Sequence, residues 1–245
     1  MTNDLPIQTI DTTNYQFGYL EHRVDNSSHP PIVMVHGYPG RPQDFRFLFP
    51  HLPNFHCIAL AMPNLDISKT KTDVSTTTIR NRERAIVEFL DAMNIDECIL
   101  MGHSMGGPLM ISTTRHHPDR VKGLIIISSV GAQQYRVFRN SKPHWGYQLV
   151  RFPILRSLFT PFMVWMFRKL GFPKGISANA MIHVLHCAHD FSFEENKDNL
   201  AAIQQPVLNI WSDNDPYVER ELFEEIDGLL TNGENLIVSG GGHNP

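Results

Sequence analysis

The sequence has few cysteines, no visible secretory signal and no apolar run long enough to cross a membrane. Its 245 residues include three cysteines, Cys57, Cys98 and Cys187. An odd number without paired spacing argues against a disulfide framework and indicates buried, reduced thiols, so we expect a reducing, cytoplasmic location. The N-terminal MTNDLPIQTI has neither a basic nor an apolar region, which predicts no secretory signal. Charged residues and a glycine interrupt the most apolar segment, residues 152–172, so no transmembrane segment is expected.

The chain also lacks a strong charge bias, internal repeats and low-complexity tracts. Lys and Arg number 21 against 25 Asp and Glu, which gives a formal net charge of −4. No cluster of Lys and Arg stands out, so no nucleic-acid partner is predicted. Apolar residues make up 42% and charged residues 19%, an ordinary globular balance. A chain of this length can bury a sizeable core, and α/β folds of this size are often one domain.

What the sequence does contain is an alternation of short apolar runs and helix-like segments. Residues 5–24 predict an antiparallel hairpin at a sheet edge. Buried strands are predicted at 32–35, 57–61, 98–101, 124–129, 207–211 and 236–238, and helices at 41–52, 76–93, 107–116 and 218–230. Repeated strand–helix–strand units imply right-handed crossovers. We therefore predict an α/β fold with a doubly wound, mostly parallel sheet.

The alternation stops between residues 132 and 200. This stretch has no strand-like run, and it predicts helices at 147–156, 161–170 and 177–188 with an acidic turn near 194–200. We interpret residues 132–200 as a helical cap inserted after the sixth strand. The core would then consist of residues 1–131 and 201–245.

Histidines within the predicted cap raise the question of a metal site. His183, His186 and His189 are spaced by three residues, and Cys187 lies among them. Positions i and i+6 diverge on a helix, and no fourth ligand is evident. We therefore expect these to be ordinary cap residues, with no metal and no cofactor.

The segment Gly102-His103-Ser104-Met105-Gly106 fits the pattern G-x-S-x-G. An apolar strand precedes it and a helix follows, which is the context of a nucleophile elbow, with Ser104 exposed at the end of a strand. The turn requires small neighbours, which the two glycines provide. The alternative is a plain strand-to-helix turn in which the serine caps the helix.

Other chemically active residues follow strands and so lie at the same sheet edge as Ser104. His36–Gly40 forms a glycine-rich turn, in which we expect His36 to be structural and the Tyr38 N–H to serve, with the Met105 N–H, as an oxyanion donor. His243 follows the last strand as the candidate base. Asp213 and Asp215 both follow the strand at 207–211, and we prefer Asp215 as the acid. Ser104, Asp215 and His243 then form a catalytic triad in the chain order expected for elbow hydrolases.

The chain resembles the α/β-hydrolase superfamily, in its capped esterase/lipase and epoxide-hydrolase-like branch. The resemblance covers nearly the whole chain and is carried by HGYPG at 36–40, GHSMGG at 102–107, HPDRV at 117–121, PVLNIWSDNDPYV at 206–218 and GGGH at 240–243. HGYPG is also similar to the HGGPG loop of proline iminopeptidases, whose elbow differs. The resemblance implies a serine hydrolase that forms an acyl-enzyme. Epoxide hydrolases and haloalkane dehalogenases carry aspartate where this chain has Ser104.

Two features depart from the family pattern. The loop at 61–68, AMPNLDIS, lacks the glycines and first aspartate of the usual DxPGxGxS. The sequence ends two residues after His243, whereas the family adds a C-terminal helix. We therefore expect a truncated chain in which the segment carrying His243 can fray.

Together these patterns predict a serine esterase acting on a small, apolar ester-type substrate. A carbon–carbon bond hydrolase, an amidase and a cofactor-free perhydrolase would share the same triad. A non-catalytic ligand-binding protein on a hydrolase scaffold is the alternative from another class.

Overall fold

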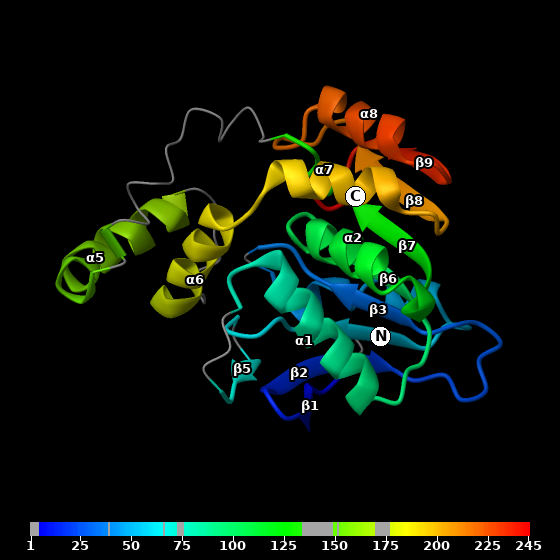
Figure 1. The fold of residues 1–245 in the computed structure, drawn as a ribbon, viewed down its shortest axis with the longest axis horizontal. Coiled ribbons are helices and arrows are strands. Elements are labelled where there is room, and N and C mark those ends of the chain that lie inside the picture. Colours follow the sequence, from blue (N-terminus) through cyan, green and yellow to red (C-terminus); the bar gives the residue numbers. More distant parts are fainter. Residues whose placement is uncertain are drawn as a thin grey trace.

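The structure is a computed structural model, and it describes residues 5–38, 40–65, 67–72, 76–133, 149–150, 152–169 and 177–245. Within these residues one nine-stranded sheet forms the centre of the molecule, in the order β1-β2-β4-β3-β6-β7-β8-β9 with β5 paired to β2 (Figure 1). The strands are β1 (Gln8–Asp11), β2 (Tyr15–His22), β3 (Ile32–Val35), β4 (Cys57–Leu60), β5 (Lys69–Thr70), β6 (Cys98–His103), β7 (Val121–Ile127), β8 (Val207–Ser212) and β9 (Gly233–Val238).

Strand direction confirms the predicted fold class. Strands β4, β3, β6, β7, β8 and β9 run parallel to one another. Strand β2 is antiparallel to β1, β4 and β5, so the predicted N-terminal hairpin lies at one edge. In such a sheet the carboxyl ends of the parallel strands share one edge, where ligand sites form.

Helices cover the sheet and continue beyond its strand ends. They are α1 (Ile79–Ala92), α2 (Gly106–His116), α5 (Pro153–Lys169), α6 (Ala178–His189), α7 (Phe193–Ala202) and α8 (Arg220–Leu229), with 3-10 turns η1 (Pro42–Phe45), η2 (Phe49–His51) and η3 (Pro118–Arg120). Helix α1 begins at an N-cap, because the Thr78 side chain accepts a hydrogen bond from the Asn81 N–H. Helices α1 and α2 lie side by side against the sheet (Figure 1).

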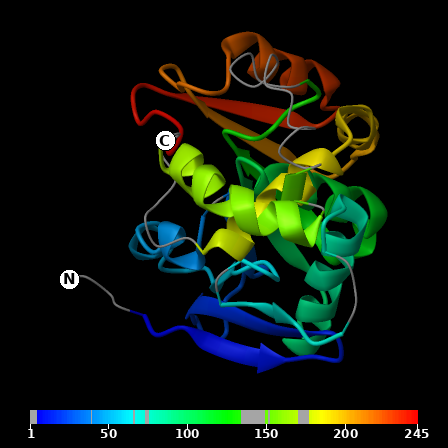
Figure 2. The same ribbon diagram turned by 90° about the vertical axis from the view of Figure 1, so that its left-hand side faces the viewer.

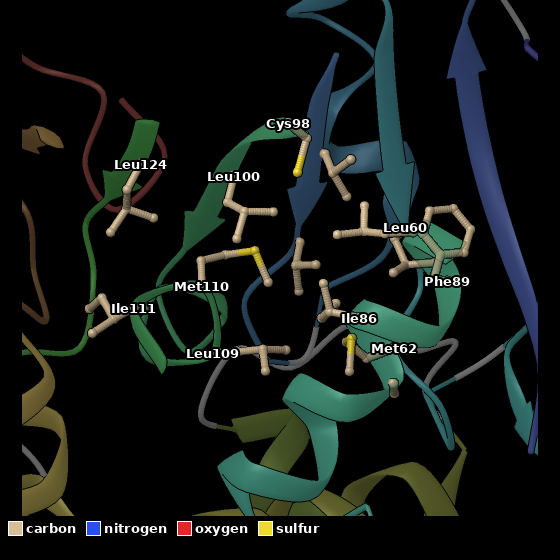
Figure 3. Close-up of a cluster of buried hydrophobic side chains, with 14 of the residues drawn as sticks. Leu60, Met62, Ile86, Phe89, Cys98, Leu100, Leu109, Met110, Ile111 and Leu124 are labelled. Atoms are coloured by element: carbon tan, nitrogen blue, oxygen red, sulfur yellow. The ribbon is translucent and has the colours of Figure 1, made fainter. Parts of the chain in front are cut away.

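Alternate residues of the central strands are buried on opposite faces of the sheet. Val33 and Val35 of β3 join the core beneath α1 and α2, and Figure 3 shows side chains of β4, β6 and β7 in this core pointing toward those two helices. Ile32 and Met34 join a second core with Phe45 of η1. Burial on both faces explains why the strands read as continuous apolar runs, and each fully buried side chain contributes about 1.5–3 kcal/mol. The strand ends that carry the site are therefore held rigidly.

Helices α5 and α6 follow β7 in the chain and stand apart from the sheet. They lie on the side of the molecule toward which β7 ends (Figures 1 and 2). Helix α7, which falls within the predicted cap at residues 132–200, packs against α2. The assignment of residues 132–200 as a cap stays a prediction, and residues 134–148 and 170–176 lie outside the described part. No helix in the described part of the chain is long and apolar enough to cross a membrane.

Three local predictions are wrong. Residues 41–52 form two 3-10 turns instead of one helix, because prolines at 42 and 50 remove backbone donors. No strand was predicted between residues 61 and 76, but β5 lies there, so the helical excursion follows the seventh strand of the structure and not the sixth. The break predicted near Pro161 is absent, since α5 runs through it. Met163 and Val164, just beyond the proline, pack with residues of α6 and hold α5 in line.

Candidate active site

Ser104 lies on a sharp turn between β6 and α2. Its φ of 50° is in the left-handed region, which is strained for a residue with a side chain. Hydrogen bonds hold this conformation: the Ser104 N–H donates to the Ile127 carbonyl at 2.9 Å, and the Ser104 carbonyl accepts from the Gly107 N–H at 3.0 Å. A Cβ at Gly102 would lie 2.6 Å from the Gly106 carbonyl oxygen, so the turn admits only glycine there. The alternative interpretation is wrong, because the N-cap of α2 is Met105, not the serine.

Three predicted side chains meet in one hydrogen-bonded chain. His243 Nε2 lies 2.9 Å from Ser104 Oγ, and His243 Nδ1 lies 2.9 Å from Asp215 Oδ2. An ionised carboxylate can only accept, so Nδ1 carries the proton and Nε2 is left to accept from the serine hydroxyl. The Asp215 side chain is fully buried, and that of His243 is 17% exposed. The arrangement places a base on the hydroxyl and an acid behind the base.

Asp215 is held as a carboxylate. Burial raises its pKa, but hydrogen bonds from His243 and from the Val218 and Tyr217 N–H groups outweigh that effect, and the net shift is downward. Those two N–H groups donate to Oδ1 at 3.0 and 2.8 Å. The other candidate acid, Asp213, accepts instead from the Gly240 N–H at 2.9 Å. Of the two carboxylates, the structure brings Asp215 to His243.

The loop before His243 is fastened to the end of β8. Gly240, Gly241 and Gly242 have φ values of 79°, 96° and 63°, which explains the run of glycines. The Gly242 N–H donates to Asn214 Oδ1 at 2.9 Å. Ser212 Oγ donates to the Gly240 carbonyl at 2.6 Å. The segment expected to fray thus carries several hydrogen bonds, and the roles of Asn214 and Ser212 were missed from the sequence.

His103 also supports the base and was not predicted to do so. Its Nε2 donates to the His243 carbonyl at 2.7 Å, and the centroids of the two imidazole rings are 5.0 Å apart. Burial lowers the pKa of His103 to about 4, although the bond to the His243 carbonyl opposes that shift. A neutral ring can therefore act as a fixed donor behind His243. In the sequence, the position of His103 directly before Ser104 in GHSMGG was the one indication of this role.

The residues of the two predicted oxyanion donors lie in the turn after β3 and at the start of α2. A Cβ at Gly37 would lie 2.8 Å from the Ser104 Cβ, so the turn after β3 touches the serine closely. The backbone N–H groups of Tyr38 and Met105 donate no hydrogen bond within the described residues. Met105 stands at the N-terminus of α2, where the helix dipole favours negative charge. His36 Nδ1 donates to the Gly37 carbonyl at 2.8 Å, the structural role predicted for it.

The Tyr38 side chain turns away into the protein. Its Oη accepts a hydrogen bond from the guanidinium of Arg82, which is completely buried. Arg82 also lies over the Tyr38 ring, 5.3 Å from its centroid. Burial raises the pKa of Tyr38, so it stays protonated. This contact fixes the residue whose backbone N–H is the candidate donor.

The histidines of α6 do not form a metal centre among the residues that the structure describes, where no group of three or more potential ligands is placed around a common point. His183 contacts Cys187 instead, with Nε2 3.5 Å from Sγ. Burial and the charge of Arg82 lower the pKa of His183 to about 4. All three cysteines of the chain are free and buried.

Comparison with known proteins identifies the family. The sequence model of the family described as alpha/beta hydrolase fold matches residues 30–245. The chain belongs to this family. Among solved structures, a loop variant of the haloalkane dehalogenase DbeA from Bradyrhizobium elkanii has a TM-score of 0.76 at 16% identity, covering 98% of this chain and 90% of that one. A thioesterase domain from the curacin biosynthetic pathway has a TM-score of 0.73 at 16% identity, covering 99% and 94%. At such identities these likenesses show the fold alone.

Curated relatives of this alpha/beta hydrolase differ in activity. The uncharacterized hydrolase YugF of Bacillus subtilis is 28% identical over 50% of this chain and 44% of its own length. Haloalkane dehalogenase 2 of Mycobacterium tuberculosis is 29% identical over 43% and 37%. Both matches therefore span less than half of the relative. Lipase 3 of a Moraxella species is 22% identical over 99% of this chain and 80% of the lipase. Family and relatives support hydrolysis without giving the bond that is cleaved.

Proposed function

We propose that this alpha/beta hydrolase is a serine hydrolase that cleaves carboxylic esters. The observation that carries the proposal is the chain of two 2.9 Å contacts from Ser104 through His243 to Asp215. His243 Nε2 takes the hydroxyl proton as Ser104 Oγ attacks the ester carbonyl, and the protonated imidazole then gives that proton to the departing alcohol. The acyl group stays on Ser104 as an ester. Water, activated by His243, hydrolyses this ester and restores the hydroxyl.

The negative charge that forms on the carbonyl oxygen needs donors fixed in advance. The N–H groups of Tyr38 and Met105 are the proposed pair, and each would contribute on the order of 3 kcal/mol to the transition state. Their lack of other partners within the described residues supports this role, since they need not break a bond to bind the oxyanion.

Ser104 also favours esters over the substrates of the dehalogenase and epoxide-hydrolase relatives. Attack of a serine oxygen on a carbon–halogen bond or an epoxide would form an ether on the enzyme. Water with a histidine base does not cleave an ether, so the cycle would stop after one turnover. Attack on a carbonyl forms an ester, which the same site can hydrolyse.

The proposed substrate is a small, apolar ester, and the proposed location is the cytoplasm. Apolar and aromatic side chains are frequent in residues 132–200, the predicted cap, which supports an apolar acyl or alcohol group. The three free cysteines support a reducing compartment.

A fluorophosphonate probe and a panel of esters of increasing chain length test this function. Wild-type protein should be labelled one-to-one and turn over at least one ester, and Ser104→Ala should lose both. Ser128→Ala is a matched control, because Ser128 is also buried at a strand end with a positive φ of 42° and its hydroxyl has no partner within the described residues. Labelling retained in Ser104→Ala would refute the assignment. Ligand binding without labelling of the wild type would favour a non-catalytic binding protein.

A further inference from the structure

The whole-chain charge of −4 conceals an uneven distribution. Of the 21 Lys and Arg residues, eight lie between residues 132 and 189, whereas none of the 25 Asp and Glu residues do. The rest of the chain is strongly acidic. The cations form no local cluster in the sequence, because they are spread through an apolar and aromatic segment. A stretch without any acidic residue is suited to a negatively charged partner.

Helix α5, in the middle of this stretch, presents an apolar stripe to solvent. Its members recur at i, i+4, i+8 and i+11, a spacing that places them on one face of a helix. The exposed fractions are 79% for Ile154, 70% for Leu158, 56% for Phe162 and 57% for Trp165. Arg168 and Lys169 are exposed at the end of the same helix and form no ion pair within the described residues. We call these six residues the α5 stripe.

The opposite face of α5 is already packed. Met163 and Val164 join a small core with Met181 and Ile182 of α6. A helix rich in apolar residues on several sides is normally buried, yet the described residues cover α5 on the side that faces α6. Figures 1 and 2 show the reason for this exposure, because α5 is the outermost helix on its side of the molecule. Within the described part of the chain, nothing covers the stripe and removes it from water.

We propose that the α5 stripe docks on the surface of an anionic phospholipid bilayer. Ile154, Leu158, Phe162 and Trp165 enter the boundary between headgroups and acyl chains, with the helix lying in the membrane plane. Arg168 and Lys169 reach the lipid phosphates, and their long stems let the charges stay at headgroup level. This binding depends on no catalytic residue and stands apart from the proposed ester hydrolysis.

The chemistry of the α5 stripe favours lipid over a second copy of the chain. Two copies that met through the α5 stripe would leave Arg168 and Lys169 without an anionic partner from this stretch, because residues 132–189 of either copy contain no Asp or Glu. A bilayer offers negative phosphates beside an apolar layer, which matches the stripe in both respects. Tryptophan and phenylalanine at the centre of the stripe suit the membrane interface, where aromatic residues are enriched.

Co-sedimentation of the full chain with vesicles tests the proposal. We expect binding to phosphatidylcholine vesicles that contain phosphatidylglycerol and weaker binding to vesicles of phosphatidylcholine alone. At high salt the two kinds of vesicle should bind the chain equally. Trp165 supplies a local probe, since quenching by brominated lipid should disappear in Trp165→Phe while binding remains. Ser104→Ala should bind as well as the wild type, which separates docking from hydrolysis.

Two variants and one control locate the surface. Phe162→Ser combined with Trp165→Ser should weaken partitioning by about tenfold or more for each side chain removed. Arg168→Glu combined with Lys169→Glu should weaken binding to anionic vesicles by about fivefold or more per charge. Ile237→Ser is the matched control, because Ile237 is 51% exposed on β9, at the other end of the molecule from α5 (Figure 1). All five side chains are exposed, so circular dichroism and Tm should show little change.

Three results would overturn the proposal. One is a wild-type chain that stays in the supernatant with anionic vesicles. Another is a chain that binds vesicles equally well with either double variant. The third is a wild-type dimer that the Phe162 and Trp165 variant converts to a monomer without any vesicle binding, which would assign the α5 stripe to self-association.

Discussion

Replacing Asp215 by Asn tests the hydrogen-bonded chain at its most informative point. The carboxylate accepts from His243 Nδ1 at 2.9 Å and from two backbone N–H groups through its other oxygen. In Asp215→Asn the amide oxygen can keep the backbone bonds, so the loop should hold its shape. The amide NH₂ then faces Nδ1, and the imidazole must turn that nitrogen into an acceptor. The proton moves to Nε2, which can no longer accept from Ser104.

The magnitude follows from this change of tautomer. Loss of the base in a serine–histidine–aspartate site lowers kcat by about 10⁴-fold, which is about 5.5 kcal/mol in the activation free energy. KM for a small ester should change little, because Asp215 is buried and lies behind the base. The assay is initial-rate hydrolysis of the best nitrophenyl ester from the substrate panel, with active-site titration to normalise the enzyme.

Asp213→Asn is the matched control for this experiment. Asp213 lies two residues earlier, and a neutral amide oxygen there can still accept from the Gly240 N–H. We expect it to retain activity within about tenfold of the wild type. The reasoning would be refuted if Asp215→Asn also stayed within that range, or if both variants fell to the same extent.

Three further predictions follow from the geometry of the site. Gly102→Ala should lower Tm by several degrees, because the new Cβ would lie 2.6 Å from a carbonyl oxygen. Gly123→Ala is the control and should change Tm little, because the atom nearest to its Cβ would be 3.6 Å away. Equal shifts in the two variants would contradict the close approach at Gly102. Asn214→Ala removes the acceptor for the Gly242 N–H and should reduce kcat on the same ester by about 10- to 100-fold with KM unchanged. An unchanged kcat would show that His243 does not depend on this hydrogen bond. Since the pKa of Asp215 is lowered on folding, its carboxylate stabilises the fold above the unfolded value of about 3.9, and this contribution is lost as pH falls through the folded pKa. Urea unfolding between neutral pH and the acid range should therefore show a smaller loss of stability for Asp215→Asn than for the wild type, and parallel curves would contradict the shift.

Much of the fold could be predicted from the sequence because its signals are local. Apolar runs such as the one at 32–35 are buried on both faces, and a strand of that kind needs no distant information to be recognised. The glycines around Ser104 are required by contacts within the same turn. Both features depend on residues that are near one another in the chain.

The remaining features depend on contacts between distant segments. Asn214 accepts a hydrogen bond from the Gly242 N–H, and His103 donates one to the His243 carbonyl. Both bonds exist only after β8 and β9 have paired beside β7. Helix α5 continues past Pro161 because α6 packs on it, which outweighs the local preference of proline. The basic character of residues 132–189 was hidden because net charge averages over the whole chain.

The contact between Ser104 and His243 has a consequence for how the protein is made. The two residues are 139 positions apart in the chain. At ordinary rates of translation, the ribosome needs about 7 to 28 s to synthesise the chain between them. The elbow can form early with β6 and α2. The hydrogen bond between the Ser104 hydroxyl and His243 can form only after β9 and the residues that follow it have emerged. Recovery of probe labelling during synthesis or refolding should therefore report completion of the sheet, later than signals from helix formation.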